Sequence, residues 1–70
     1  MNITTALNLL QIVGPIVARA PEFVALYEAA IAILNADDQV VAKEALADIQ
    51  ADNDEGHARL QAKLAAASRS

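Results

Sequence analysis

The composition of the chain changes abruptly near Asn35, and this change constrains the fold more than any other feature. Residues 1–34 carry 15 Met, Val, Ile, Leu and Phe side chains and only three charges, Arg19, Glu22 and Glu28. Residues 35–70 carry six such apolar side chains and eleven charges. Because apolar surface is driven out of water, the first half must be covered by other elements. The second half has too few apolar side chains to form anything more apolar than an amphipathic helix.

The size and the residue types predict a single all-α domain over residues 1–70. Alanine, the strongest helix former, occurs 17 times, and glycine and proline occur twice each. A chain of 70 residues is close to the lower limit for independent folding, and scaffolds of this size usually add disulfides, a metal or oligomerisation. There is no cysteine. We therefore expect the chain to associate with other chains in a helical assembly.

A first helix is expected over residues 3–18. Its large apolar side chains span an arc of roughly 220° at 100° per residue, more than one neighbouring helix can cover. Gly14-Pro15 should kink it, because proline removes a hydrogen bond and clashes with a carbonyl of the preceding turn. Alternatively, the helix stops at Val13 and a short second helix starts at Pro15. The arc consists of Ile3, Leu7, Leu9, Leu10, Ile12, Val13, Ile16 and Val17.

A second helix is expected over residues 21–34, and it completes an apolar helical hairpin over residues 1–34. Pro21 suits the first turn of a helix, and Glu22 complements the helix dipole. Large apolar side chains cover half of this helix, whereas alanines cover much of the other half. Asn35-Ala36 is expected to be a turn.

A long amphipathic helix is expected over residues 37–67, with Asp37 as its N-cap. Its apolar and small residues follow a narrow seam of heptad type, with Leu64 beside it. Seven acids and one base lie in residues 37–55, whereas residues 56–70 carry three bases and no acid. This order suits the dipole of one helix. The alternative is a break within Asp52–Gly56 and a new helix capped near Asn53. The seam consists of Ala42, Leu46, Ile49, Asn53, Gly56, Leu60 and Ala67.

The lengths of these elements predict that the end of the long helix lies outside the intramolecular core. At 1.5 Å per residue, residues 37–67 form a rod of roughly 46 Å, whereas the first two helices are about 24 and 21 Å long. Leu60 and Leu64 would then be exposed. Burial of a leucine stabilises by about 1.5–3 kcal/mol, so residues 53–67 are expected to dock on another chain.

Neither a metal site nor a catalytic site is predicted. An EF-hand loop with Gly56 at its sixth position would need an oxygen ligand at Ala51 and a glutamate at Ala62. His57, as a general base, would need a partner held in a pocket. It is interpreted as a surface or seam-edge histidine, with a pH-sensitive interface contact as the alternative. We therefore expect no enzyme, no cofactor and no small-molecule substrate.

The residues expected to bind a partner lie on the second and third predicted helices. Phe23 and Tyr27, one turn apart, are either core residues or a binding hot spot. Asn53 either fixes the register of an oligomer or marks a break in the helix. The full set is Phe23, Tyr27, Leu46, Ile49, Asn53, Leu60 and Leu64.

The net charge of −4 argues against nucleic acid as a partner, because phosphate binding requires a basic surface. The apolar run of residues 3–18 is interrupted by Asn8, Gln11 and Gly14-Pro15, and it is shorter than the roughly 20 residues that span a bilayer. We expect a soluble protein, either cytoplasmic or assembled in a virion. A membrane-active hairpin of the holin type is the alternative.

The stretch of residues 54–64, DEGHARLQAKL, resembles the short all-helical proteins that tailed phages encode near their structural or lysis genes. The resemblance covers 11 of 70 residues. It implies a virion component or a small assembly factor and assigns no functional residue. The function expected from the sequence is that of a non-enzymatic structural or interaction protein, whose partner is itself or another protein. A small inhibitor of a host protein is the other alternative.

Overall fold

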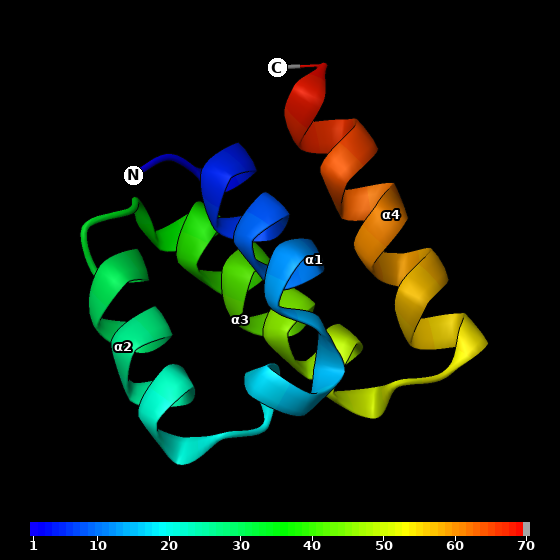
Figure 1. Ribbon diagram of the computed structural model, residues 1–70. Coiled ribbons are helices and arrows are strands. Elements are labelled where there is room, and N and C mark those ends of the chain that lie inside the picture. The colour runs from blue at the N-terminus through cyan, green and yellow to red at the C-terminus, as the bar shows by residue number, and fades with distance from the viewer. Residues whose placement is uncertain (70) are drawn as a thin grey trace.

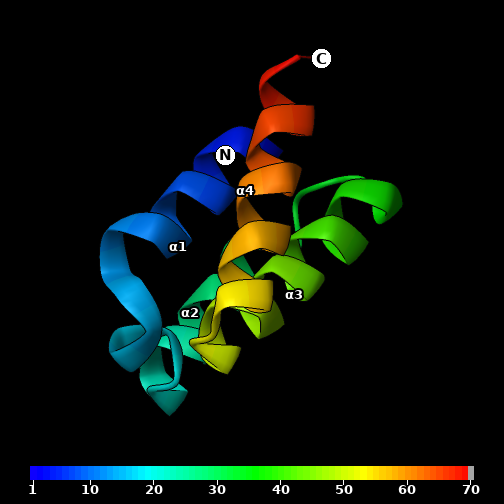
Figure 2. The same ribbon diagram turned by 90° about the vertical axis from the view of Figure 1, so that its right-hand side faces the viewer.

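The computed structural model describes residues 1–69 and is all-helical over that range. Its four helices are α1 (Ile3–Ala18), α2 (Pro21–Ile31), α3 (Ala36–Ala51) and α4 (Asp54–Ser68). Figure 1 shows α1 in front of α3, with α2 and α4 on opposite sides of this pair. The view from the side agrees with this arrangement (Figure 2). The all-α fold and the antiparallel α1–α2 hairpin predicted from the sequence are confirmed.

One core joins the four helices. Its largest fully buried side chains come from every helix except α3, which contributes Leu46, Ile49 and two alanines to the same cluster. The most extensive contacts are between α1 and α3, and between α3 and α4, whereas α2 makes fewer contacts with its neighbours. The fully buried large side chains are Leu7, Leu10, Tyr27, Ile31 and Leu60.

The predicted kink in α1 is confirmed, and Gly14 is the residue that makes it. Gly14 has φ 77° and ψ 176°, which are not helical values, so α1 consists of two helical segments joined at this kink. The alternative of a helix that stops at Val13 and a short helix that starts at Pro15 therefore describes the same geometry. The residue before a proline is disfavoured in the α region, and glycine is the residue that tolerates a positive φ. The dipeptide Gly14-Pro15 therefore redirects the last turn of α1. That turn is held by Gln50, whose Nε2 donates to the Ala18 carbonyl at 2.8 Å.

Helix α2 ends at Ile31, three residues before the predicted end. The Gln39 side chain donates from Nε2 to the carbonyls of Ala32 (3.1 Å) and Leu34 (2.8 Å), so these groups are satisfied without a further helical turn. Asn35, and not Asp37, is the N-cap of α3, because its side chain accepts from the Asp38 backbone N–H at 2.8 Å. The prediction of Asp37 as the cap is wrong.

The prediction of one long helix over residues 37–67 is also wrong. Asp52 ends α3 in the left-handed conformation, with φ 51° and ψ 50°. Asn53 then caps α4 by accepting from the Gly56 N–H at 2.7 Å. The alternative reading, a break with a new helix capped near Asn53, is the correct one. Helix α4 turns back and packs against α3 (Figure 1).

This reversal places the end of the chain inside the intramolecular core. The principal extents are 28 × 25 × 17 Å, so no rod of 46 Å is present in the described residues. Leu60 is 1 % exposed and Leu64 is 9 % exposed, both within their own chain. The prediction that these two leucines project beyond the core is therefore wrong. The reason is that the chain reverses after Asp52, so α4 packs back against α3 and brings both leucines into the core.

Candidate functional site

The candidate site is an apolar face on α1 and α2. Four large aliphatic side chains between residues 12 and 33 are strongly exposed: Ile12 (81 %), Ile16 (83 %), Leu26 (71 %) and Ile33 (71 %). These four residues are called the apolar face below. Ile12 and Ile16 lie on α1, before and after the kink at Gly14, Leu26 lies on α2, and Ile33 lies in the turn after it. The wide apolar arc predicted for the first helix explains why its outer side is still apolar.

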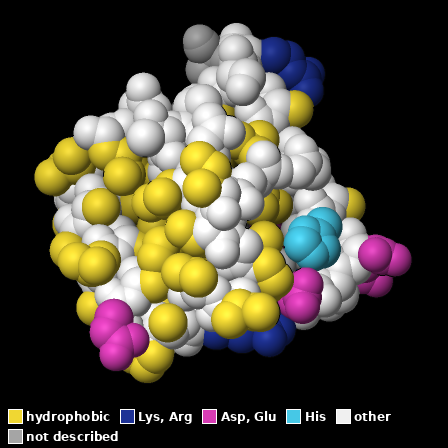
Figure 3. Space-filling model, viewed as in Figure 1, with side chains coloured by type: hydrophobic (Ala, Val, Ile, Leu, Met, Phe, Trp, Pro, Cys, Tyr) yellow, Lys and Arg dark blue, Asp and Glu magenta, His cyan; other side chains and the backbone are white. Residues whose placement is uncertain are grey.

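Charges are sparse on this face. Figure 3 shows hydrophobic side chains gathered over α1 and α2, with acidic and basic side chains toward the margins of the view. The only charged residues of α1, α2 and their connection are Arg19, Glu22 and Glu28. The Arg19 guanidinium is engaged, because its Nε donates to the Gln50 carbonyl at 2.8 Å. An exposed apolar surface with few charges is the usual property of a protein–protein contact.

Most of the residues predicted to bind a partner are instead core residues of their own chain. Tyr27, Leu46, Ile49, Leu60 and Leu64 are all buried, and none of them belongs to the apolar face. Phe23 is half-buried and packs against the core. Asn53 is exposed and caps α4, so it marks a break in the helix rather than a seam position. These contacts agree with the interpretation of Phe23 and Tyr27 as core residues.

Tyr27 fastens α2 to α3. Its ring is stacked on that of Phe23, with centroids 5.8 Å apart. Its hydroxyl donates to the Ala42 carbonyl at 3.0 Å in a buried position. Burial raises the pKa of this hydroxyl to about 12, because the phenolate would lose its hydration. The residue is therefore structural.

We expect the protein to lose stability as the pH rises from 10 to about 12. In the unfolded chain Tyr27 ionises near its ordinary pKa of 10, whereas in the fold its pKa is about 12. The contribution of Tyr27 to the free energy of unfolding is fully present below pH 10 and is lost as the pH rises through the folded pKa. A shift of this size corresponds to a loss of about 2–3 kcal/mol. Urea unfolding between pH 8 and 12 measures this. Tyr27→Phe should cost about 1 kcal/mol at pH 8 and should flatten the dependence. An unchanged slope in that variant would contradict the assignment.

An ion-pair cluster that sequence reasoning missed joins α3 to α4. The Asp48 carboxylate is almost fully buried, receiving Arg59 Nε at 3.0 Å on Oδ1 and Lys63 Nζ on Oδ2. Burial on its own raises the pKa of the Asp48 carboxyl. The hydrogen bonds and charges of Lys63 and Arg59 outweigh burial and hold that pKa below its ordinary value. On a single long helix these residues are too far apart to meet, so only the reversal of α4 reveals the cluster.

His57 is the remaining candidate that the sequence raised. His57 is half-exposed, with its Nε2 3.4 Å from the Asp52 carboxylate, as expected for a surface histidine. Among residues 1–69 no group of three or more His, Cys, Asp or Glu side chains is placed to hold a metal ion. Within the same range, no helix is long and apolar enough to cross a membrane.

Comparisons of the chain with protein-family models, with curated proteins and with solved structures find no match. The resemblance of residues 54–64 to phage proteins therefore stays a prediction. The candidate site depends on the geometry of the apolar face alone.

Proposed function

We propose that the chain is a non-enzymatic interaction protein that works inside a multi-chain assembly. Its apolar face packs against a helix of another chain, and a second copy of this chain is the partner to test first. The observation that carries the proposal is the strong exposure of Ile12, Ile16, Leu26 and Ile33 on α1, α2 and the turn after α2 of a folded domain. The uncharged character of residues 1–18 supports it further, because charges are depleted at the centre of interfaces.

Burial of the apolar face against another chain is favourable in free energy. Full burial of one Leu or Ile side chain stabilises by about 1.5–3 kcal/mol, so four such side chains can hold a substantial part of a contact. Leu60 and Leu64 are buried, whereas the apolar face holds the four most exposed large hydrophobic side chains of residues 1–69. Association through helix packing is the mode that such a face suits.

Sedimentation at micromolar concentration tests the proposal. We expect the parent chain to form species well above 7.4 kDa. The double variant Ile12→Ser with Leu26→Ser should weaken association at least tenfold, because it places two hydroxyls in an apolar contact. The helical content should be retained, because both side chains are exposed in the folded chain.

Val40→Ser with Ala47→Ser is the matched control. Both positions are exposed on α3, which contributes no residue to the apolar face, and this variant should associate like the parent. A parent chain that sediments as a compact, cooperatively folded monomer would overturn assembly with itself. Equal association of the two double variants would overturn the assignment to this face.

A further inference from the structure

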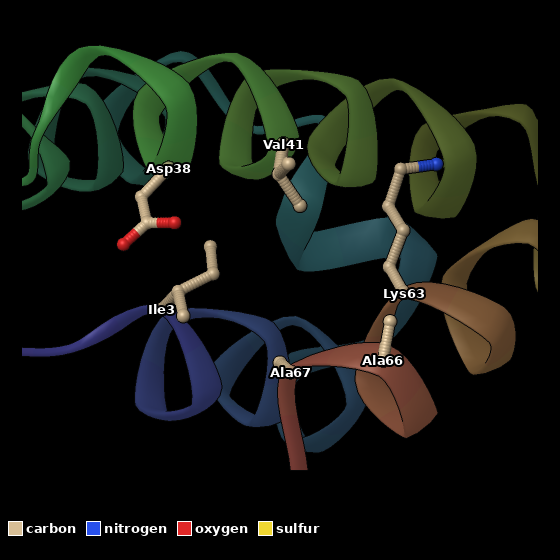
Figure 4. Close-up of a pocket in the computed structure, with 6 residues that line it drawn as sticks. All are labelled: Ile3, Asp38, Val41, Lys63, Ala66 and Ala67. Carbon is tan, nitrogen blue, oxygen red and sulfur yellow. The ribbon is translucent and has the colours of Figure 1, made fainter. Parts of the chain in front are cut away.

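A pocket opens at the other side of α1, where three helices diverge. It lies between the start of α1, the first turns of α3 and the end of α4, and its volume is about 240 Å³. Figure 4 shows the side chains that surround it. Its lining residues are Ile3, Asp38, Val41, Lys63, Ala66 and Ala67. None of them belongs to the apolar face, so the pocket is a separate feature of the surface.

The walls of the pocket are aliphatic. Ile3 from α1 and Val41 from α3 face each other across it, and Ala66 and Ala67 of α4 form its floor (Figure 4). The pocket is smaller than the 300–1,000 Å³ of sites that hold drug-sized ligands. It is suited to one extended aliphatic chain, such as a single long side chain.

The two charged residues of the pocket differ in their partners. Lys63 Nζ is bound to the buried Asp48 carboxylate, at the end of the pocket away from Asp38 (Figure 4). Asp38 Oδ2 accepts from Asn35 Nδ2 at 3.3 Å. Its Oδ1 has no hydrogen-bond partner within residues 1–69. Asp38 is therefore the acidic residue of this pocket, and no basic side chain of residues 1–69 forms an ion pair with it.

We propose that the pocket binds a basic side chain, arginine or lysine, of a partner protein. The methylene stem lies between Ile3, Val41 and Ala66, and the cationic head meets the free oxygen of Asp38. Long basic side chains bury their stems on apolar surface while their charge stays at the rim, and arginine is enriched at interface hot spots. The net charge of −4 favours the approach of such a basic partner.

The probe is a blocked arginine, N-acetyl-L-arginine amide, titrated into the labelled full chain and followed by heteronuclear NMR. Its matched control is N-acetyl-L-citrulline amide, which has the same shape and no charge. We expect saturable shifts at Ile3, Val41 and Ala67, and affinity for the arginine probe roughly two- to fivefold above that for citrulline, the range for a solvent-exposed ion pair. Free L-arginine should bind no tighter than the blocked form, because a residue in a chain presents no free α-groups.

Two variants of α3 separate the pocket from the general acidity of the surface. Asp38→Asn should remove the preference for arginine over citrulline. Asp37→Asn removes the same charge from the same first turn, outside the pocket lining, and should leave the preference unchanged. Ala66→Leu fills the pocket and should abolish the saturable shifts for both probes.

Three results would overturn the proposal. They are equal affinity for arginine and citrulline in the parent, an equal effect of the two aspartate variants, or tight binding of free L-arginine alone. The last would identify a site for a small molecule rather than for a partner protein. Because the readout uses residues away from the apolar face, its failure is distinguishable from failure of the assembly experiment.

Discussion

Replacing Gly56 by alanine is expected to destabilise the protein by roughly 3 kcal/mol, at the upper end of the usual range for overpacking. A Cβ atom at this position would overlap the backbone carbonyl oxygen of Asp48 and would lie 3.1 Å from Asn53 Oδ1. The first of these atoms belongs to the backbone of α3, so no side-chain rotation can move it away. Helix α4 would have to move away from α3. That movement would loosen Leu60 and the ion pairs of Asp48.

The sign of this effect is opposite to the one that helix propensity predicts. Alanine is favoured over glycine by about 0.8–1 kcal/mol in a helix interior, so a gain in stability would show that the close approach is absent. Ala62→Gly, at an exposed position of the same helix, calibrates the propensity term. Urea unfolding of the parent and both variants gives the comparison. A loss of 3 kcal/mol is a large fraction of the 0.05–0.15 kcal/mol per residue that stabilises a typical domain.

The first half of the fold was predictable because its signals are local. Gly14-Pro15 fixes the kink of α1 whatever surrounds it, and Pro21 starts α2 at the predicted residue. The apolar arc of α1 is wider than one neighbouring helix can cover, and Ile12 and Ile16 are accordingly exposed. Each of these conclusions depends on residues within one or two turns of each other.

The sequence did not distinguish one long helix from the two helices α3 and α4, because its main signals fit both arrangements. Acids followed by bases suit the dipole of one long helix. They equally suit two antiparallel helices, in which Arg59 and Lys63 return to Asp48. The 3–4 spacing of the seam likewise continues through the break. A tertiary contact distinguishes the two arrangements. Gly56 lies against the Asp48 carbonyl, and only the reversed chain makes this contact.

The pocket could not be predicted for a related reason. Its walls come from Ile3, Val41 and Ala66, which are far apart in the sequence and carry no motif. The error about Leu60 and Leu64 has the same origin as the missed break, since their burial depends on the direction of α4. A narrow apolar seam identifies which side of a helix is covered, but it does not identify the chain that covers it.

Leu60→Ala is expected to destabilise the isolated chain by about 2–5 kcal/mol, the range for a buried leucine whose removal leaves a cavity. Leu60 is 1 % exposed and belongs to the single core cluster, so its surroundings can collapse only in part. Leu26→Ala is the matched control, because the same atoms are removed at a position that is 71 % exposed. Its cost should be below about 0.5 kcal/mol in the monomer, as for surface substitutions.

The two leucines also differ in how their effects depend on protein concentration. The loss caused by Leu60→Ala should be the same at all concentrations, because the contact lies within one chain. The loss caused by Leu26→Ala should appear only where the chain is assembled, since assembly linked to folding makes apparent stability concentration-dependent. Thermal unfolding at 2 and 200 μM distinguishes them. If Leu60→Ala affected stability only at the higher concentration, Leu60 would be an intermolecular contact and the reversal of α4 onto α3 would be wrong.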